Sequence, residues 1–262
     1  MAIVLTDSRG VEYTLPQTAK IEGFDFPTRI PANVVPGRPG AIVSTSWVAK
    51  GSIKGTLRVL YPGDTNIAAE TWRRVLAAIF AYPPIMLVRD TSIDDYINVW
   101  CENILARYIE RTNMSYIELT CSLVAHDPYF NATELTEVDG EITAVAGNIS
   151  VTNSGTGLVR PTITIVGSGT VGGADQMTDI TIVNTTTNQT ITYTGNLEAT
   201  DTLVLDCENY TAKINGVSVF ADVAGLTDVF SLAAGSNTVS VVAATAAGGA
   251  GDVTISFRAR WH

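Results

Sequence analysis

The sequence predicts a mainly β chain with an N-terminal α+β domain followed by a C-terminal β-sandwich. Three observations carry this prediction. The first half contains one apolar stripe with helical spacing, runs that alternate apolar and polar residues recur along the chain, and a polar, acidic stretch separates the halves. A length of 262 residues with 46% apolar residues suffices for two cores. We therefore expect domains over residues 1–131 and 148–262, with a linker over 132–147.

The N-terminal domain is expected to combine antiparallel strands with one helix at about residues 66–82. A hairpin over residues 3–15 opens the domain, and long strands over 96–107 and 112–125 follow the helix. The helix ends before Pro83-Pro84, because proline lacks the N–H that the next turn needs. Its apolar stripe, which we interpret as core packing, consists of Ala68, Trp72, Val75, Leu76, Ile79 and Phe80.

The segment Ile30–Gly40 interrupts the regular pattern. It contains three prolines and two glycines, which disfavour a strand ladder, so we interpret it as an extended arm or loop. Such a segment in a compact domain is often functional or ordered by a partner. A flexible surface loop is the equally weighted alternative.

The C-terminal domain is organised around residues 197–220. Leu203 and Leu205 alternate with less apolar residues, as a half-buried strand requires. Asn215-Gly216 then lies between two further alternating runs, and this dipeptide suits the two positive φ angles of a type I′ turn. We therefore expect two adjacent antiparallel strands here, within a series of short strands without a helix, which is typical of a β-sandwich.

An ordered set of residues in this domain resembles the C-terminal half of the siphophage distal tail proteins. The set begins with a leucine and an aspartate, continues through a strand that ends in aspartate and through Asn-Gly, and closes with a Phe-x-Leu-x-x-Gly-x-Asn pattern. Its members are Leu197, Asp201, Leu203, Leu205, Asp206, Asn215, Gly216, Phe230, Leu232, Gly235 and Asn237. The order of hairpin, arm, helix and two long strands up to Asp127-Pro128-Tyr129-Phe130 is similar to the ring-forming (belt) domain of the same family.

The resemblance implies a structural protein with a galectin-like C-terminal sandwich and no catalytic function or cofactor. It implies a hexameric ring in the virion tail, assembled in the host cytoplasm. The ring joins the tail tube protein to the tail tip or baseplate proteins, and DNA passes through its channel. Our candidates for the oligomer interface are Val34, Val35, Pro36, Arg38, Arg73 and Arg74. The chain has no long insertion between its recognisable blocks, which favours the compact, adaptor-only type.

Composition argues against several other classes. Residues 1–131 hold 12 basic and 13 acidic residues, whereas residues 132–262 hold 4 and 13, so the C-terminal domain carries most of the net charge of −10. A surface of that sign repels phosphate backbones, so we expect no specific nucleic-acid binding. The first residues lack the features of a signal peptide and no apolar run reaches membrane-spanning length. We expect Cys101, Cys121 and Cys207 to be reduced and buried.

Catalytic patterns are scarce, and we expect no enzyme and no metal site. The two histidines, His126 and His262, cannot supply a multi-histidine site, and the Gly-rich run over 167–173 lacks the lysine and the following helix of a phosphate loop. The carboxylates that could form a glycosidase pair are Asp201, Asp206, Glu208 and Asp222.

Two alternatives remain open. One is a carbohydrate-binding sandwich for host-surface glycans, which would need an exposed aromatic platform and would depend on Tyr193 or Trp261. The other is a tail tube or baseplate component of a different type, which would show a different ring symmetry or polymerise into tubes.

Overall fold

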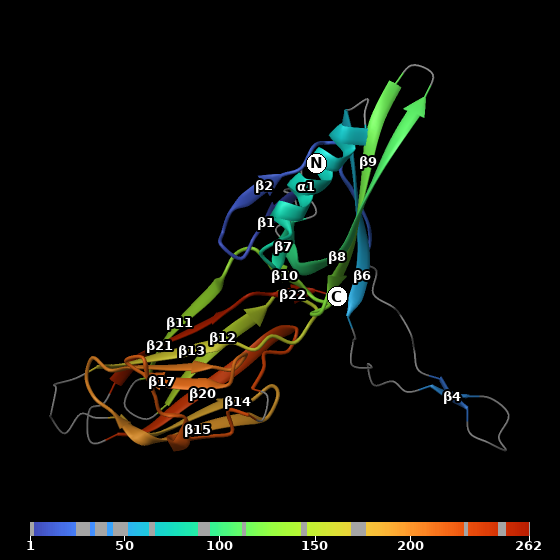
Figure 1. The fold of residues 1–262 in the computed structure, drawn as a ribbon. Helices are drawn as coiled ribbons and strands as arrows, with labels where there is room; N and C mark the ends of the chain where they lie inside the picture. Colours follow the sequence, from blue (N-terminus) through green and yellow to red (C-terminus); the bar gives the residue numbers. More distant parts are fainter. Residues whose placement is uncertain are drawn as a thin grey trace. The chain divides into compact units, whose positions relative to one another are not determined.

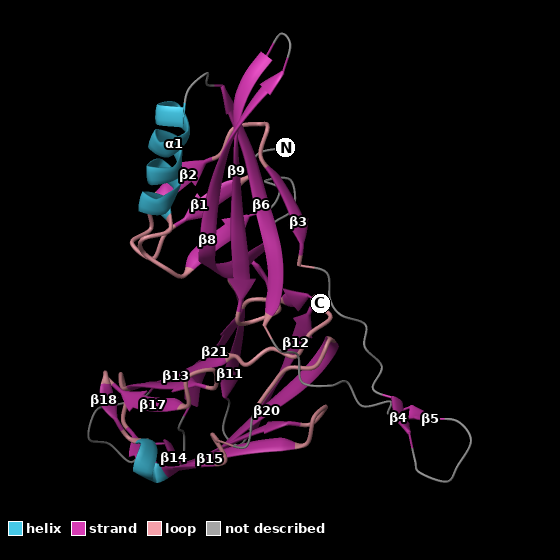
Figure 2. Cartoon of the chain, turned by 45° about the vertical axis from the view of Figure 1, so that its right-hand side comes forward, coloured by secondary structure: helices cyan, strands magenta, loops and turns pink. Residues whose placement is uncertain are grey.

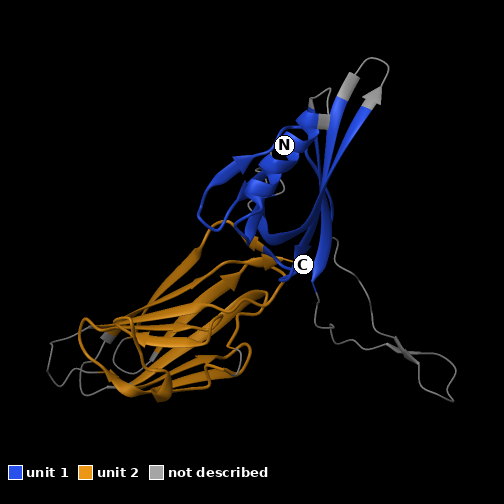
Figure 3. Cartoon of the chain, viewed as in Figure 1, with its two compact units in different colours: residues 1–130, 262 blue, residues 131–261 orange. Residues whose placement is uncertain are grey.

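A computed structural model describes residues 3–24, 32–34, 41–43, 52–62, 66–88, 95–111, 114–142, 146–168, 177–227, 230–245 and 250–261 (Figure 1). The chain divides into two compact units, which Figure 3 distinguishes by colour. Unit 1 comprises Met1–Phe130 and His262, and unit 2 comprises Asn131–Trp261. Each unit has its own set of strands and its own buried residues, so each is described separately.

The strands of unit 1 form an antiparallel sheet in the order β2-β1-β7-β8-β9-β6-β3. Its longest members pair over most of their length, with β8 opposite β9 and β9 opposite β6. The alternation read from the sequence is therefore a ladder with one apolar and one polar face. The strand bounds are β1 Val4–Thr6, β2 Glu12–Thr14, β3 Lys20–Gly23, β6 Ile53–Pro62, β7 Ile85–Val88, β8 Asp95–Arg111 and β9 Met114–Ala125.

Helix α1, Asn66–Ile79, lies against the apolar face of this sheet (Figure 2). Its inward residues Ala69, Leu76 and Ile79 are buried, and the ring of Trp72 stacks on that of Tyr61 at a centroid distance of 3.9 Å. The expected helix is confirmed, and it ends at Ile79, one turn before the two prolines. Val75 departs from the expected core packing, since it is 42% exposed. Packing of this stripe, rather than helix propensity, stabilises an element of this length.

Within the expected arm, the structure describes the start of a two-stranded pair. Strand β4, Ala32–Val34, pairs in antiparallel register with β5, Ala41–Val43. The rest of the predicted arm, including Val35, Pro36 and Arg38, lies outside the described residues.

Unit 2 is a sandwich of two antiparallel sheets. One sheet has the order β11-β21-β13-β16-β17-β18 and the other the order β12-β20-β14-β15-β19. The bounds of the first sheet are β11 Thr136–Ile142, β13 Thr162–Ser168, β16 Thr202–Asp206, β17 Thr211–Ile214, β18 Val217–Ser218 and β21 Ala250–Phe257. Those of the second are β12 Ala146–Asn153, β14 Met177–Asn184, β15 Gln189–Leu197, β19 Val223–Ala224 and β20 Gly235–Thr245. The remaining elements are β10 Phe130–Ala132, the 3₁₀ turn η1 Phe220–Asp222 and β22 Arg260–Trp261.

The core of unit 2 lies between these sheets. Leu203 and Leu205 on β16 are fully buried, as their alternation predicts, and they face Ile165 and Ile163 on β13. Apolar residues of the second sheet, such as Ile182 and Val241, complete the same cluster. The mainly β architecture predicted from the sequence is confirmed.

Two sequence interpretations need correction. The range 132–147 is not simply a linker, because Thr136–Ile142 forms edge strand β11, paired along its whole length with β21. Glu137, Asp139 and Glu141 stand on its exposed face, and their charge concealed the strand alternation. Cys101 is only half-buried, since the ladder between β8 and β9 is interrupted by a bulge next to it. Among the described residues, no helix has the length and hydrophobicity to cross a membrane.

Candidate functional site

The Asn215-Gly216 turn joins β17 to β18 and is tied to the start of β16. Both residues have positive φ, 49° and 84°, as a type I′ turn requires. The side chain of Asn215 accepts a hydrogen bond from the Thr202 amide at 3.0 Å and donates one to Asp201 at 2.7 Å. Asp201 also accepts from the Glu198 amide at 3.2 Å. These motif residues therefore hold two adjacent turns together.

Asp206 ends β16 by capping the turn that follows it. Its carboxylate accepts hydrogen bonds from the amides of Glu208 and Asn209, each at 2.9 Å. Glu208 in turn forms an ion pair with Arg260 at 2.8 Å. Asp201, Asp206 and Glu208, which the sequence offered as possible catalytic carboxylates, are thus engaged in turn and ion-pair contacts. Asp222 lies in the turn η1, where the hydroxyl of Thr194 donates to its backbone carbonyl at 3.2 Å.

Asn237 and Asn184 form a buried polar cluster where β20 begins and β14 ends. Asn237 is 1% exposed, accepts from the Ala233 amide at 2.9 Å, and donates to the carbonyls of Ala233 and Gly235 at 2.8 and 3.0 Å. Asn184 donates to the Ser231 carbonyl at 2.8 Å. These hydrogen bonds offset the cost of removing the amide groups from water. The cluster therefore fixes the loop that carries the Phe-x-Leu pattern.

The apolar motif residues anchor that same loop in the core. Phe230 and Leu232 are 1% and 0% exposed, and the amide of Leu232 donates to the Val159 carbonyl at 2.7 Å. Leu197 is 1% exposed at the end of β15. Gly235 has a φ of 85°, a conformation that glycine adopts without strain. The set recognised in the sequence is thus a structural framework of turns and core contacts.

Arg73 and Arg74, the two helix residues among our interface candidates, both form hydrogen bonds with Glu70 of the same helix. Arg73 forms two hydrogen bonds to Glu70, both at 2.7 Å, and Arg74 forms one at 3.1 Å. These bonds lower the pKa of Glu70 to about 2, and the bonds from Arg73 have the larger effect. Both arginines remain partly exposed, so the triad keeps one net positive charge on one flank of the helix.

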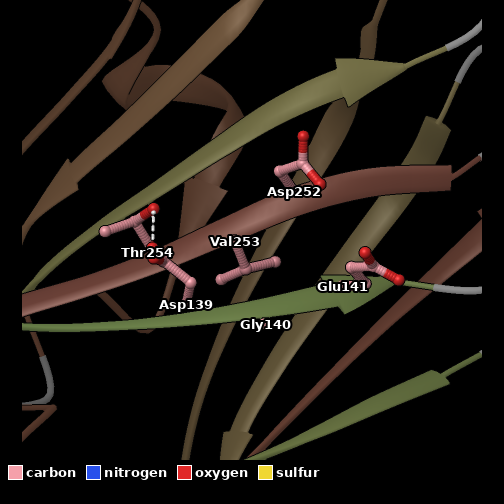
Figure 4. A pocket seen from close by; sticks show the side chains of 6 residues that line it. All are labelled: Asp139, Gly140, Glu141, Asp252, Val253 and Thr254. Atoms are coloured by element: carbon pink, nitrogen blue, oxygen red, sulfur yellow. Dashed lines mark hydrogen bonds between the residues drawn. The ribbon is translucent and has the colours of Figure 1, made fainter.

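An acidic pocket occupies one edge of the six-stranded sheet, between β11 and β21 (Figure 4). Glu141 and Asp252 are direct cross-strand partners, and the hydroxyl of Thr254 donates to Asp139 at 2.8 Å. The sequence interpretation missed this arrangement, although acidic residues at every second position were a signal for it. Among the described residues, no group of His, Cys, Asp and Glu side chains forms a metal-binding cluster. The lining consists of Asp139, Gly140, Glu141, Asp252, Val253 and Thr254.

Tyr193 is too deeply buried to form the exposed aromatic platform that the carbohydrate alternative requires. That side chain is 3% exposed, its hydroxyl donates to the Asn196 carbonyl at 3.1 Å, and burial raises its pKa. Trp261 is half-buried on β22. A test of glycan binding at Tyr193 would therefore perturb the core rather than a surface.

Comparisons with known proteins agree with this framework. Residues 154–261, all within unit 2, match the family model described as "Siphovirus-type tail component, C-terminal domain". The whole chain superimposes on the Dit protein (gp 19.1) of phage SPP1 with a TM-score of 0.69 and 16% identity, covering 100% of both chains. A chain of the phage p2 baseplate in its activated conformation with Sr gives a TM-score of 0.50 and 6% identity, covering 97% of both chains. No curated protein sequence matches.

The fold, with its framework of turns and core contacts, and the family match define a structural component of a phage tail. More specifically, residues 154–261 are similar to the C-terminal domain of siphovirus-type tail components, and the chain shares the fold of the SPP1 Dit protein.

Proposed function

We propose that this protein assembles into a hexameric ring that joins the tail tube to the tail tip or baseplate, with a channel through which DNA passes. The observation that carries the proposal is the fold shared with the SPP1 Dit protein over the full length of both chains. That protein is described as a paradigm of the hub adsorption apparatus in phages that infect Gram-positive bacteria. An adaptor of this kind works by shape, so it needs a rigid framework and no reactive group.

The two units differ in a way that suits separate roles in such a ring. Unit 2 carries nearly all of the net negative charge, and like-charged surfaces repel when they are brought together. Unit 1 is close to neutral and exposes apolar side chains on α1, with Ile67 at 80% and Val75 at 42%. Exposed apolar side chains on one element favour a protein contact. We therefore assign ring formation to unit 1 and outward projection to unit 2.

The arm over residues 30–40 and the flank of α1 are the proposed contact regions between neighbouring subunits. The described part of the arm, β4 with β5, offers backbone edges that a second subunit can pair with. Arg73 and Arg74 lie on the helix beside Val75, and Glu70 already compensates part of their charge. Each contact joins two different surfaces, and contacts of this kind generate a ring when the rotation between neighbours closes. Deletion of residues 34–39 should weaken assembly, and an unchanged oligomer would count against this role of the arm.

The remaining parts of the proposal follow from the ring. The tail tube protein would bind one of its faces and the tip or baseplate proteins the other, after assembly in the host cytoplasm and within the virion tail. DNA would pass the channel without sequence-specific contact, since specific recognition requires base-edge readout. We propose the compact, adaptor-only form for this chain.

Negative-stain class averages of the purified full chain test this proposal. We expect six-fold rings with a central hole and peripheral lobes. Val75→Asp, on the exposed side of α1, should reduce the fraction of rings, because it places a charge in the apolar contact. Val217→Asp is the matched control, since Val217 is 70% exposed in unit 2. Rings of another symmetry, tubes, or equal loss in both variants would contradict the proposal.

A further inference from the structure

Two cysteines of unit 1 lie side by side on neighbouring strands. Cys101 on β8 is opposite Leu123 of β9, and Cys121 on β9 is opposite Ile104 of β8. The register shifts between Cys101 and Asn103, so Glu102 is the extra residue of a bulge. The two cysteines are therefore diagonal neighbours across the ladder, and each thiol shifts the pKa of the other.

The two thiols differ in exposure. Cys121 is fully buried, whereas Cys101 is half-buried and its thiol also donates to the Asn103 carbonyl at 3.4 Å. A dissolved oxidant can therefore reach Cys101 first. The third thiol, Cys207, is fully buried in the core of unit 2, where burial raises its pKa to about 12. It provides an internal reference that should not react.

We propose that Cys101 and Cys121 form a reversible disulfide bond when the protein meets a hydroperoxide oxidant. In the first step the Cys101 thiolate attacks the peroxide, the O–O bond breaks, and Cys101 becomes a sulfenic acid while water or an alcohol leaves. In the second step the sulfur of Cys121 attacks the sulfur of Cys101. The S–S bond forms, the S–O bond breaks, and the hydroxide leaves as water with the proton of Cys121. Overall, the peroxide is reduced and two thiols are oxidised.

The electrostatics of the pair support this order of events. The thiol of Cys121 lowers the pKa of Cys101, and the thiol of Cys101, together with burial, raises the pKa of Cys121. Because the thiolate is the reactive form, Cys101 is the nucleophile toward peroxide. Cys121 then stands within reach as the resolving thiol.

The bulge provides the movement that bond formation needs. A disulfide requires its sulfurs to approach to about 2.05 Å, closer than any hydrogen-bonded pair of thiols. Strand β8 is least constrained by ladder bonds at the bulge, next to Cys101. The new bond would join β8 to β9 between the two long strands that dominate unit 1, and would thus resist their separation.

Thiol counting on the full chain tests the proposal. The reduced protein is treated with hydrogen peroxide, denatured, alkylated and analysed by peptide mass spectrometry. We expect the number of alkylated cysteines to fall from three to one, with Cys207 still alkylated, and a linked peptide that joins Cys101 to Cys121. Dithiothreitol should restore all three thiols.

Two variants make the result specific. Cys121→Ser should accumulate a sulfenic acid on Cys101, trapped by dimedone, and Cys207→Ser should form the linked peptide as the parent chain does. If Cys121→Ser does not fold, Cys101→Ser serves instead, and it should keep Cys121 alkylated after peroxide. An unchanged thiol count, Cys101 over-oxidised beside a free Cys121, or a Cys101 bond between two chains would each overturn the proposal.

Discussion

The apolar face of the sheet is covered by different elements in unit 1 and in unit 2. In unit 1 a helix covers one face of the sheet, and the other face carries ion pairs such as Lys54–Glu102 and Arg58–Glu118. In unit 2 a second sheet covers the first. Its interior contains buried asparagines as well as apolar side chains. The core of unit 2 is thus enclosed by its own two sheets. Both units expose single apolar side chains, such as Ile67 on α1 and Val217 on β18, and those on α1 are the ones that we assign to contact with other subunits.

The largest expected effect comes from emptying the core of unit 2. Phe230→Ala should lower the free energy of unfolding of unit 2 by about 3–5 kcal/mol, because it removes a fully buried aromatic ring and leaves a cavity. Phe220→Ala is the matched control, since Phe220 is 43% exposed, and it should cost below about 1 kcal/mol. Urea denaturation measures both variants. Similar losses in the two would show that burial does not govern stability here.

The second prediction tests whether the hydrogen bonds of a buried asparagine stabilise unit 2. Asn237→Ala removes four hydrogen bonds, one of them from Asn184, and leaves backbone groups of Ala233 and Gly235 without their partner. We expect a cost of about 1–3 kcal/mol. Asn209→Ala should cost less, because the exposed Asn209 side chain is bonded to Asp206 at the surface. Urea denaturation of both variants is the measurement, and we expect the lower unfolding midpoint for Asn237→Ala. A lower midpoint for Asn209→Ala would contradict the assigned role of Asn237.

A comparable test for unit 1 uses the close contact between Phe24 and Gly55. An added Cβ at Gly55 would overlap the Phe24 ring, so Gly55→Ala must displace a buried aromatic side chain. We expect a loss of about 1–3 kcal/mol, typical of overpacking. Thermal unfolding is the measurement. Phe24→Leu combined with Gly55→Ala should recover part of the loss, and no recovery would mean that the clash is not the cause.

The smallest effect concerns the charge triad on α1. Its arginines hold the pKa of Glu70 at about 2, below its ordinary 4.5. The contribution of the carboxylate to stability is therefore present above about pH 4.5 and is lost as the pH falls toward about 2. Arg73→Gln should raise the pKa of Glu70 more than Arg74→Gln, since Arg73 makes the two shorter bonds. NMR titration of the Glu70 side chain provides the values, and equal shifts would refute the ranking.

Much of the fold could be predicted from the sequence because periodicity reports burial directly. The stripe that includes Trp72 and Leu76 and the alternation of Leu203 and Leu205 indicated the correct elements. Strand β11 escaped prediction because Glu137, Asp139 and Glu141 made its exposed face resemble a linker. Local pattern alone shows which strand ends become turns, as with Asn215, but not which distant residues meet.

The features that the sequence did not predict are mostly contacts between residues that lie far apart in the chain. Asn184 and Ser231, for example, are 47 positions apart in the sequence. The bulge beside Cys101, which shifts the register of β8 against β9, follows from no spacing rule. Such features arise from tertiary packing, which fixes register and bulges after the strands have met.

The mass of the full chain in solution tests the central claim most directly. Native mass spectrometry or light scattering should give a species of six chains, each of 27.8 kDa, whose proportion falls in Val75→Asp and not in Val217→Asp. A single chain at every concentration, or a closed assembly with another number of subunits, would contradict the hexameric adaptor.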